Sequence, residues 1–168
     1  ILLQAHGIEV WGKQSFIKKL FLRQADLVLP VSEFTKNNLI QYKGLSSEKC
    51  VVFHNSLDPY FDTSKNLMIE EKLIQKHQIK PDDTILITLT RLVSSEKYKG
   101  YDKVIKALAK INTHHTKYKY LILGKYDDSE YKRVNQLIAE LNLQNQVILG
   151  GYIADDEISS YFNLAHLF

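Results

Sequence analysis

Residues 84–108 constrain the fold of this chain most, because they combine an apolar run, a polar loop and a helical pattern in one short segment. The apolar run, residues 85–89, is rich in β-branched residues and is typical of a parallel strand covered on both faces. Further along, apolar residues recur at helical spacing at Val104, Ile105, Leu108 and Ile111. The helix is expected to begin near Tyr101 or Asp102. This order of elements predicts an α/β fold.

The loop between this strand and helix carries two cations, Arg91 and Lys99, and then Gly100. Ligands of open α/β sheets bind beyond the carboxyl ends of the strands, and the N-terminus of a helix favours an anion. Arg91 offers a planar fork for phosphate oxygens, Lys99 offers a compact charge, and Gly100 allows a close approach of the backbone. A diphosphate fits this pattern. The residues alone also allow two solvated loop cations.

Several motifs resemble family four of the retaining glycosyltransferases, enzymes of the GT-B fold. The segments that carry the resemblance are TRL, KGYDKVIKAL, ADLVLPVSEFTKNNL, VVFHNSLDPYF, YLILGKYDDSEY and VILGGYIADDEISSYFNLAHLF. The resemblance implies an α/β, GT-B-like architecture of two Rossmann-like parallel-sheet domains, both incomplete in this chain. Residues 1–58 would form the end of the amino-terminal, acceptor-side domain and the crossing. Residues 59–168 would form the first part of the nucleotide-sugar-binding domain.

The resemblance also implies roles for individual residues. It assigns binding of the donor diphosphate to Arg91 and Lys99, with Gly100 beside them. It places the nucleobase against the backbone of a later loop, at Gly151, Tyr152 and Ile153. The glycines of that loop by themselves predict a tight turn equally well. His6 follows an expected strand over residues 1–5, and the resemblance makes it a candidate catalytic residue on the acceptor side. A structural hydrogen-bonding role for His6 is the alternative.

The function implied by the resemblance is transfer of a sugar from a nucleotide-diphosphate sugar to a sugar or lipid-linked acceptor, with retention, in bacterial polysaccharide or glycolipid synthesis. No cofactor is expected beyond this donor. The family's later glycine loop and paired glutamates do not occur in these residues, so the chain alone is expected to be inactive. A nucleotide-sugar epimerase of the same fold is one alternative.

A non-catalytic nucleic-acid-binding module is a further alternative, prompted by KYKGYDK and HHTKYKY, in which Lys and Tyr alternate. The first run spans the expected start of a helix and the second leads into an expected strand, so ordinary loop composition explains both. The net charge of +3 is too small to indicate a nucleic acid by itself. We therefore expect no nucleic-acid partner.

Three further expectations concern location and metals. A basic helix expected over residues 13–24 either rests on an anionic membrane surface or packs on the sheet. No apolar run approaches the roughly 18 residues that span a membrane, and the single cysteine, Cys50, suits a reducing compartment. These features predict a cytoplasmic protein, with a peripheral position at the inner face of the membrane left open. No metal is expected, because His114 and His115 are adjacent and no HExxH or CxxC motif occurs.

Overall fold

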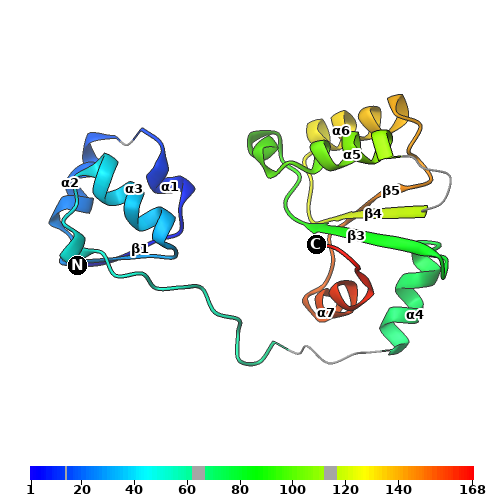
Figure 1. Cartoon of the computed structure of the whole chain (residues 1–168), viewed down its shortest axis with the longest axis horizontal. Helices are drawn as coiled ribbons and strands as arrows, with labels where there is room; N and C mark the ends of the chain where they lie inside the picture. The colour runs from blue at the N-terminus through cyan, green and yellow to red at the C-terminus, as the bar shows by residue number, and fades with distance from the viewer. Residues whose placement is uncertain (14, 62–66, 112–116) are drawn as a thin grey trace. The chain divides into compact units, whose positions relative to one another are not determined.

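A computed structural model describes residues 1–13, 15–61, 67–111 and 117–168 of the chain. The chain divides into two compact units, Ile1–Phe61 and Asp62–Phe168. Each unit contains its own parallel sheet with helices packed against it (Figure 1). The division lies close to the predicted boundary at residue 58.

Unit 1 contains a two-stranded parallel sheet made of β1 (Leu2–Ala5) and β2 (Leu27–Pro30). Its helical elements are α1 (Ile8–Trp11), α2 (Phe16–Gln24), α3 (Glu33–Lys43) and the 3-10 turn η1 (Ser47–Lys49). Serine is a preferred residue at the start of a helix, and Ser32 caps α3 by accepting a hydrogen bond from the backbone N–H of Thr35. Buried apolar residues from the sheet and all three α-helices form one core, which includes Ala5, Val10, Leu22, Val28 and Leu39.

One prediction about unit 1 needs correction, and one apolar segment lies outside its sheet. The helix expected over residues 13–24 begins at Phe16, because the side chain of Ser15 caps it by accepting from the backbone N–H of Lys18. The apolar run at residues 50–53 is no regular strand. It follows β2 through two backbone hydrogen bonds, from Val51 to Val28 and from Phe53 to Pro30, which are too few for a ladder.

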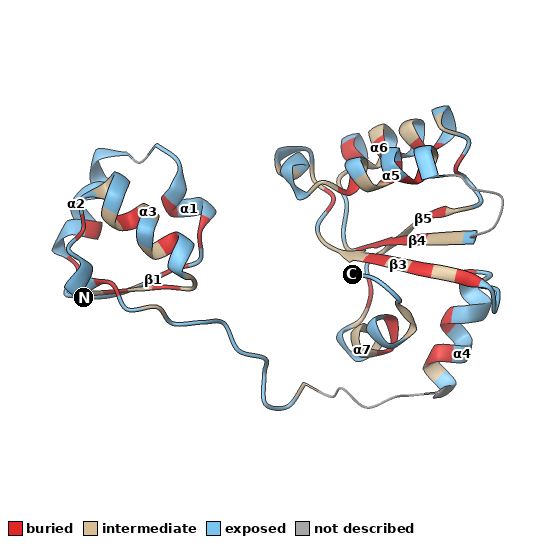
Figure 2. Ribbon diagram, in the orientation of Figure 1, coloured by how far each residue is buried: buried red, intermediate tan, exposed pale blue. Residues whose placement is uncertain are grey.

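Unit 2 contains a three-stranded parallel sheet in the order β3–β4–β5. The strands are β3 (Asp83–Leu89), β4 (Lys117–Leu123) and β5 (Val147–Gly151). The helical elements are α4 (Leu67–Lys76), the 3-10 turn η2 (Ser94–Lys99), α5 (Tyr101–Ile111), α6 (Asp128–Glu140) and α7 (Asp155–Leu164). Helices α5 and α6 cover one face of the sheet, and α4 and α7 cover the other (Figure 1). The central strand β4 is therefore buried at Leu121, Ile122 and Leu123 (Figure 2).

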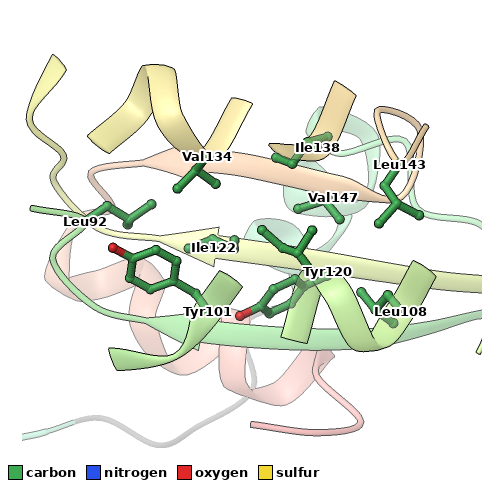
Figure 3. Close-up of a cluster of buried hydrophobic side chains, with 10 residues drawn as sticks. Leu92, Tyr101, Leu108, Tyr120, Ile122, Val134, Ile138, Leu143 and Val147 are labelled. Carbon is green, nitrogen blue, oxygen red and sulfur yellow. The ribbon is translucent and has the colours of Figure 1, made fainter. Parts of the chain in front are cut away.

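The larger core of unit 2 lies between the sheet and the helices α5 and α6. Ile105 and Leu108 of α5 and Val134 and Ile138 of α6 recur at helical spacing, so their side chains share the face that meets the sheet. They pack over strand residues that include Tyr120, Ile122 and Val147 (Figure 3). The helical patterns of the sequence are thus confirmed in α5 and α6.

Residues 164–168, LAHLF, include a short pairing with the sheet. Leu167 forms a single parallel bridge with Leu86 of β3. Three backbone hydrogen bonds support it. The N–H groups of His166 and Leu167 donate to the Ile85 carbonyl at 2.8 and 3.2 Å, and the Ile87 N–H donates to the Leu167 carbonyl at 2.9 Å. This segment lies along the edge of β3 that β4 does not occupy.

A buried polar pair joins the two helices on the second face of the sheet. His77, directly after α4, is 5% exposed, and its Nε2 lies 2.8 Å from the hydroxyl oxygen of Tyr161 in α7. Burial lowers the pKa of His77, because the charged imidazolium would lose its hydration. Burial also raises the pKa of Tyr161 to about 12. Both side chains are therefore neutral in the fold at neutral pH.

His77 predicts how the stability of unit 2 depends on pH. Its pKa in the fold is below the ordinary value of 6.5, so the unfolded chain binds the proton first as the pH falls. The stabilisation that comes from neutral His77 is therefore complete above pH 6.5 and decreases as the pH falls below that value. We expect the free energy of unfolding, measured by urea denaturation, to decrease between about pH 7 and about pH 5. His77→Gln should reduce this decrease, whereas replacement of the exposed His54 by Gln should not. Equal pH slopes for both variants would contradict the role of His77.

Candidate functional site

Three loops meet where β3, β4 and β5 end, and they enclose a hollow of about 290 Å³. Because the strands are parallel and paired in register, their carboxyl ends lie at the same edge of the sheet. Each loop contributes two neighbouring residues to the lining, which includes Thr90, Arg91, Gly124, Lys125, Tyr152 and Ile153. We call this space the carboxyl-edge hollow. It is the place where open α/β sheets bind ligands.

Glycine allows the first two loops to approach this closely. Gly124 has φ +126°, and a Cβ atom built on it would lie 2.0 Å from the carbonyl oxygen of Thr90. Backbone hydrogen bonds fix the approach, from Thr90 N–H to the Leu123 carbonyl and from Gly124 N–H to the Gly151 carbonyl. Gly151, the last residue of β5, has φ +70°. Gly124 therefore sets the spacing of the first two loops, and Gly151 supplies the left-handed backbone that begins the third.

Arg91 lies in the lining of the hollow and keeps its guanidinium accessible. Its Nη2 forms an ion pair of 2.5 Å with Oε1 of Glu96, while the Arg91 side chain stays 71% exposed. The Glu96 side chain is only 16% exposed, and its Oε2 is buried without a hydrogen-bond partner among the described residues. Because the Arg91 side chain is mostly in solvent, a phosphate could reach the guanidinium while Glu96 stays paired with it.

Lys99 and Gly100 lie further along the same loop, which is partly ordered as the 3-10 turn η2. The Nζ of Lys99 lies 5.3 Å from the ring centre of Tyr98, a cation–π distance. Gly100 adopts φ +81° and ends η2, so that α5 can begin at Tyr101. Neither Lys99 nor Gly100 is in the lining of the carboxyl-edge hollow. The structure thus brings Arg91 together with Tyr152 and Ile153, and a diphosphate contact by Lys99 stays a prediction.

Lys125 is a lining residue that the sequence analysis missed. It directly follows Gly124, and its Nζ lies 5.1 Å from the ring centre of Tyr152. Tyr152 is 63% exposed, so one aromatic surface and one further cation border the hollow. The sequence signal for Lys125 was its position directly after a strand and a glycine.

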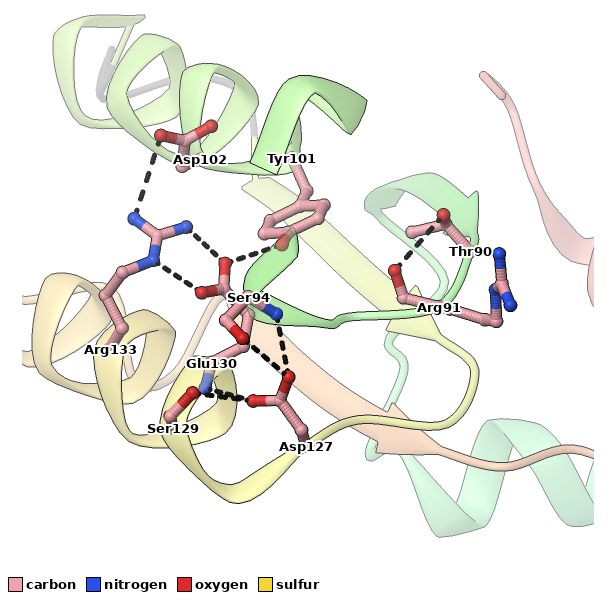
Figure 4. A network of polar contacts seen from close by, with 9 residues as sticks. All are labelled: Thr90, Arg91, Ser94, Tyr101, Asp102, Asp127, Ser129, Glu130 and Arg133. Atoms are coloured by element: carbon pink, nitrogen blue, oxygen red, sulfur yellow. Dashed lines mark hydrogen bonds and ion pairs between the residues drawn. The ribbon is translucent and has the colours of Figure 1, made fainter. Parts of the chain in front are cut away.

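A buried polar network holds the start of α5 against α6. The hydroxyl of Tyr101 donates to Oε1 of Glu130 at 2.6 Å, and Arg133 donates two hydrogen bonds to the same carboxylate (Figure 4). The Arg133 hydrogen bonds hold the pKa of Glu130 below its usual value, although burial opposes this shift. Burial, followed by the contact with Glu130, raises the pKa of Tyr101 to about 12. The network fixes the helix that follows the Lys99–Gly100 pair.

His6 lies in unit 1, directly after β1, and is exposed. Its backbone N–H and that of Gly7 both donate to Oε1 of Glu9, at 2.5 and 2.9 Å. Gly7 is required next to it, because a Cβ there would lie 2.7 Å from the Trp11 ring. These contacts define the backbone around His6, and its acceptor-side role stays a prediction.

The described part of the chain also bears on metal binding and on the nucleic-acid alternative. Within it, no group of three or more His, Cys, Asp or Glu residues could hold a metal ion, and His114 and His115 lie outside the described residues. Tyr101 and Tyr120, from the two Lys–Tyr runs, are each 1% exposed. These two rings are core residues, so they cannot stack on nucleobases.

The comparisons with known proteins agree with the fold. The family model described as glycosyl transferases group 1 matches residues 69–168. This is more than half of the chain, which therefore belongs to that family.

The relatives found are glycosyltransferases of the GT-B type. N-acetylgalactosamine-N,N'-diacetylbacillosaminyl-diphospho-undecaprenol 4-alpha-N-acetylgalactosaminyltransferase of Campylobacter jejuni is 30% identical over 137 residues, which are 82% of this chain and 33% of that protein. A solved glycosyltransferase of Rickettsia africae has a TM-score of 0.79 at 24% identity. The match covers 98% of this chain and 43% of the Rickettsia chain. Anabaena HepE in complex with UDP has a TM-score of 0.76 at 22% identity. The match covers 98% of this chain and 44% of the HepE chain.

These likenesses confirm the predicted GT-B-like fold, with two Rossmann-like parallel-sheet parts. The chain spans between a third and a half of the length of each of these three proteins. Neither the epimerase nor the nucleic-acid-binding alternative gains support from the comparisons. In the described part of the chain, every helix is too short or too polar to cross a membrane.

Proposed function

We propose that this chain provides the donor-binding part of a glycosyltransferase that takes a sugar from a nucleotide-diphosphate sugar. The acceptor would be a sugar or a lipid-linked sugar in bacterial polysaccharide or glycolipid synthesis. The observation that carries the proposal is the carboxyl-edge hollow, with Arg91 in its lining and exposed. Family membership and the fold support it, because Anabaena HepE is described as a complex with UDP.

In this proposal the donor diphosphate lies next to Arg91, with Lys99 and the backbone at Gly100 on its other side. Lys125 adds a cation at the same edge of the sheet. Tyr152 and Ile153 offer an aromatic and an apolar surface to the nucleobase, and Gly151 holds the turn before them. The volume of about 290 Å³ is at the small end for ligand pockets, roughly 300–1,000 Å³, and so suits one part of a nucleotide.

The chemistry follows from the charge on the leaving group. When the bond between sugar and diphosphate breaks, negative charge develops on the diphosphate, and nearby cations stabilise it. With retention, the acceptor hydroxyl attacks from the face that the diphosphate leaves. His6, exposed after β1, is the proposed acceptor-side catalytic residue. The donor is a substrate, so the proposal involves no cofactor.

We propose in addition that unit 1 contacts an anionic membrane at the cytoplasmic face. Helix α2 exposes four large apolar residues, led by Phe16 at 80%, and carries Lys18 and Lys19 between them. A second hollow of about 460 Å³ beside it is lined by residues that include Lys13, Lys19 and Lys43. Apolar side chains flanked by basic ones suit lipid headgroups and acyl chains. The relative from C. jejuni is named for a diphospho-undecaprenol acceptor, which agrees with this placement.

Replacement of Arg91 by Ala tests the donor site. Loss of a charged hydrogen bond to phosphate should weaken UDP binding by about 1.5 to 3 kcal/mol in isothermal titration calorimetry. The chain should still fold, with a modest loss of stability, because the Arg91 side chain is 71% exposed but Glu96 loses its ion-pair partner. Arg23→Ala, an exposed arginine of α2, is the matched control and should bind UDP like the wild type. Equal UDP affinities for the two variants would refute the assignment of Arg91.

Co-sedimentation with vesicles tests the membrane contact. Vesicles that contain phosphatidylglycerol should bind the chain, and replacing both Lys18 and Lys19 by Ala should weaken binding about tenfold or more, since each basic residue at an anionic surface contributes about 1 kcal/mol. The control replaces Lys103 and Lys106, two exposed lysines of α5, and should leave binding unchanged. If both double variants bind as the wild type does, α2 is not the contact surface.

A further inference from the structure

Asp127 connects the arginine-bearing loop to the neighbouring loop of the sheet through its two carboxylate oxygens. Oδ1 accepts hydrogen bonds from the hydroxyl of Ser129 at 2.8 Å and from the backbone N–H of Glu130 at 2.7 Å, and so caps α6. Oδ2 accepts from the backbone N–H of Ser94 at 2.7 Å and from its hydroxyl at 3.0 Å (Figure 4). Oδ1 therefore accepts hydrogen bonds at the start of α6, and Oδ2 accepts hydrogen bonds at the start of η2.

The contact with Ser94 replaces a cap that η2 lacks. The residue before η2 is Val93, whose side chain cannot accept a hydrogen bond. The N–H of Ser94 would then be left without a partner at the start of the turn. Asp127 comes from a different segment of the chain, so it anchors the start of η2 to the loop after β4 as well as capping it.

Backbone contacts next to Asp127 strengthen this junction. Leu92 N–H donates to the carbonyl of Lys125 at 2.8 Å, and Asp127 N–H donates to the carbonyl of Leu92 at 3.0 Å. Leu92 and Tyr126 thereby form a parallel bridge beyond the ends of their strands. Arg91 precedes this bridge directly, and η2 carries the Arg91 partner Glu96.

We infer that Asp127 is a positioning residue for the anion site, because it holds the loop from Arg91 to Lys99 in the conformation that meets the donor diphosphate. This inference rests on the proposed function. The Asp127 carboxylate accepts four hydrogen bonds from Ser94, Ser129 and Glu130, so its role is to hold the loop and the start of α6.

The charge of Asp127 and its positioning contacts should affect diphosphate binding in opposite directions, which allows the inference to be tested. The hydrogen bonds from the Ser94 and Glu130 backbones hold the pKa of Asp127 well below its usual range, so the group is charged at neutral pH. A negative charge near a diphosphate site opposes binding, and its removal alone would tighten binding. Removal of a positioning contact would weaken binding. The two effects have opposite signs.

Asp127→Asn is the decisive variant, with Asp128→Asn as its control. Asn caps a helix about as well as Asp but has one acceptor oxygen, so it cannot serve both α6 and Ser94. Asp128 lies in the same first turn, is exposed, and loses the same charge. We expect the Kd for UDP, measured by calorimetry, to rise about three- to tenfold in Asp127→Asn and to stay equal or fall in Asp128→Asn.

Two further measurements separate positioning from folding. Ser94→Ala keeps the α6 cap and removes one hydrogen bond to Oδ2, so it should weaken UDP binding in the same direction by a smaller factor. Hydrogen exchange of residues 93–100 without nucleotide should be faster in Asp127→Asn than in Asp128→Asn. Thermal midpoints of these variants should stay close to that of the wild type.

The outcomes distinguish the two proposals. Wild-type binding of UDP with equal affinities for Asp127→Asn and Asp128→Asn would overturn the role of Asp127 and leave the donor site intact. Equal hydrogen exchange in both variants would overturn it as well. Failure of the wild-type chain to bind UDP would instead overturn the proposed function.

Discussion

The arrangement of unit 2 depends on the close approach of two backbones where β3 and β4 end. Gly124 lies so near the Thr90 carbonyl that no other residue fits there. This contact brings the loop after β3 onto the loop after β4, and the bridge between Leu92 and Tyr126 extends the pairing beyond the sheet. Everything proposed for the site, from the exposure of Arg91 to the anchoring of η2 by Asp127, follows from these two loops lying side by side.

Two acidic side chains near this edge of the sheet are engaged by groups of the protein itself. Arg91 is held by Glu96, and the start of η2 is held by Asp127. Carboxylates so close to an anion site would oppose a diphosphate if they faced it alone. Here the mostly buried Glu96 carboxylate is already paired with Arg91, and Asp127 is engaged by four protein donors. The acidic residues thus fix the loop, and the arginine stays available to a ligand.

The sequence predicted those features that depend on local periodicity. Residues 85–89 form the buried strand expected from their apolar run, and α5 begins at Tyr101. It could not predict contacts between loops that are distant in the chain. Asp127 and Ser94 are 33 residues apart, and neither has a local pattern that names the other as its partner.

The sequence also predicted part of the lining of the carboxyl-edge hollow. Arg91, Tyr152 and Ile153 follow strands directly, so strand positions placed them at one edge of the sheet. Lys125 was missed because the loop after β4 was given no role. Lys99 was expected beside Arg91. In the structure it is the last residue of the 3-10 turn η2, and its side chain lies over the ring of Tyr98.

The most direct measurement of the central claim is a titration of the isotope-labelled chain with UDP, followed by amide chemical shifts. The account predicts that the largest shifts occur in the three loops at the carboxyl ends of β3, β4 and β5, around Arg91, Lys125 and Tyr152. Shifts confined to unit 1 or to the outer surfaces of α5 and α6, or none at saturating UDP, would contradict it.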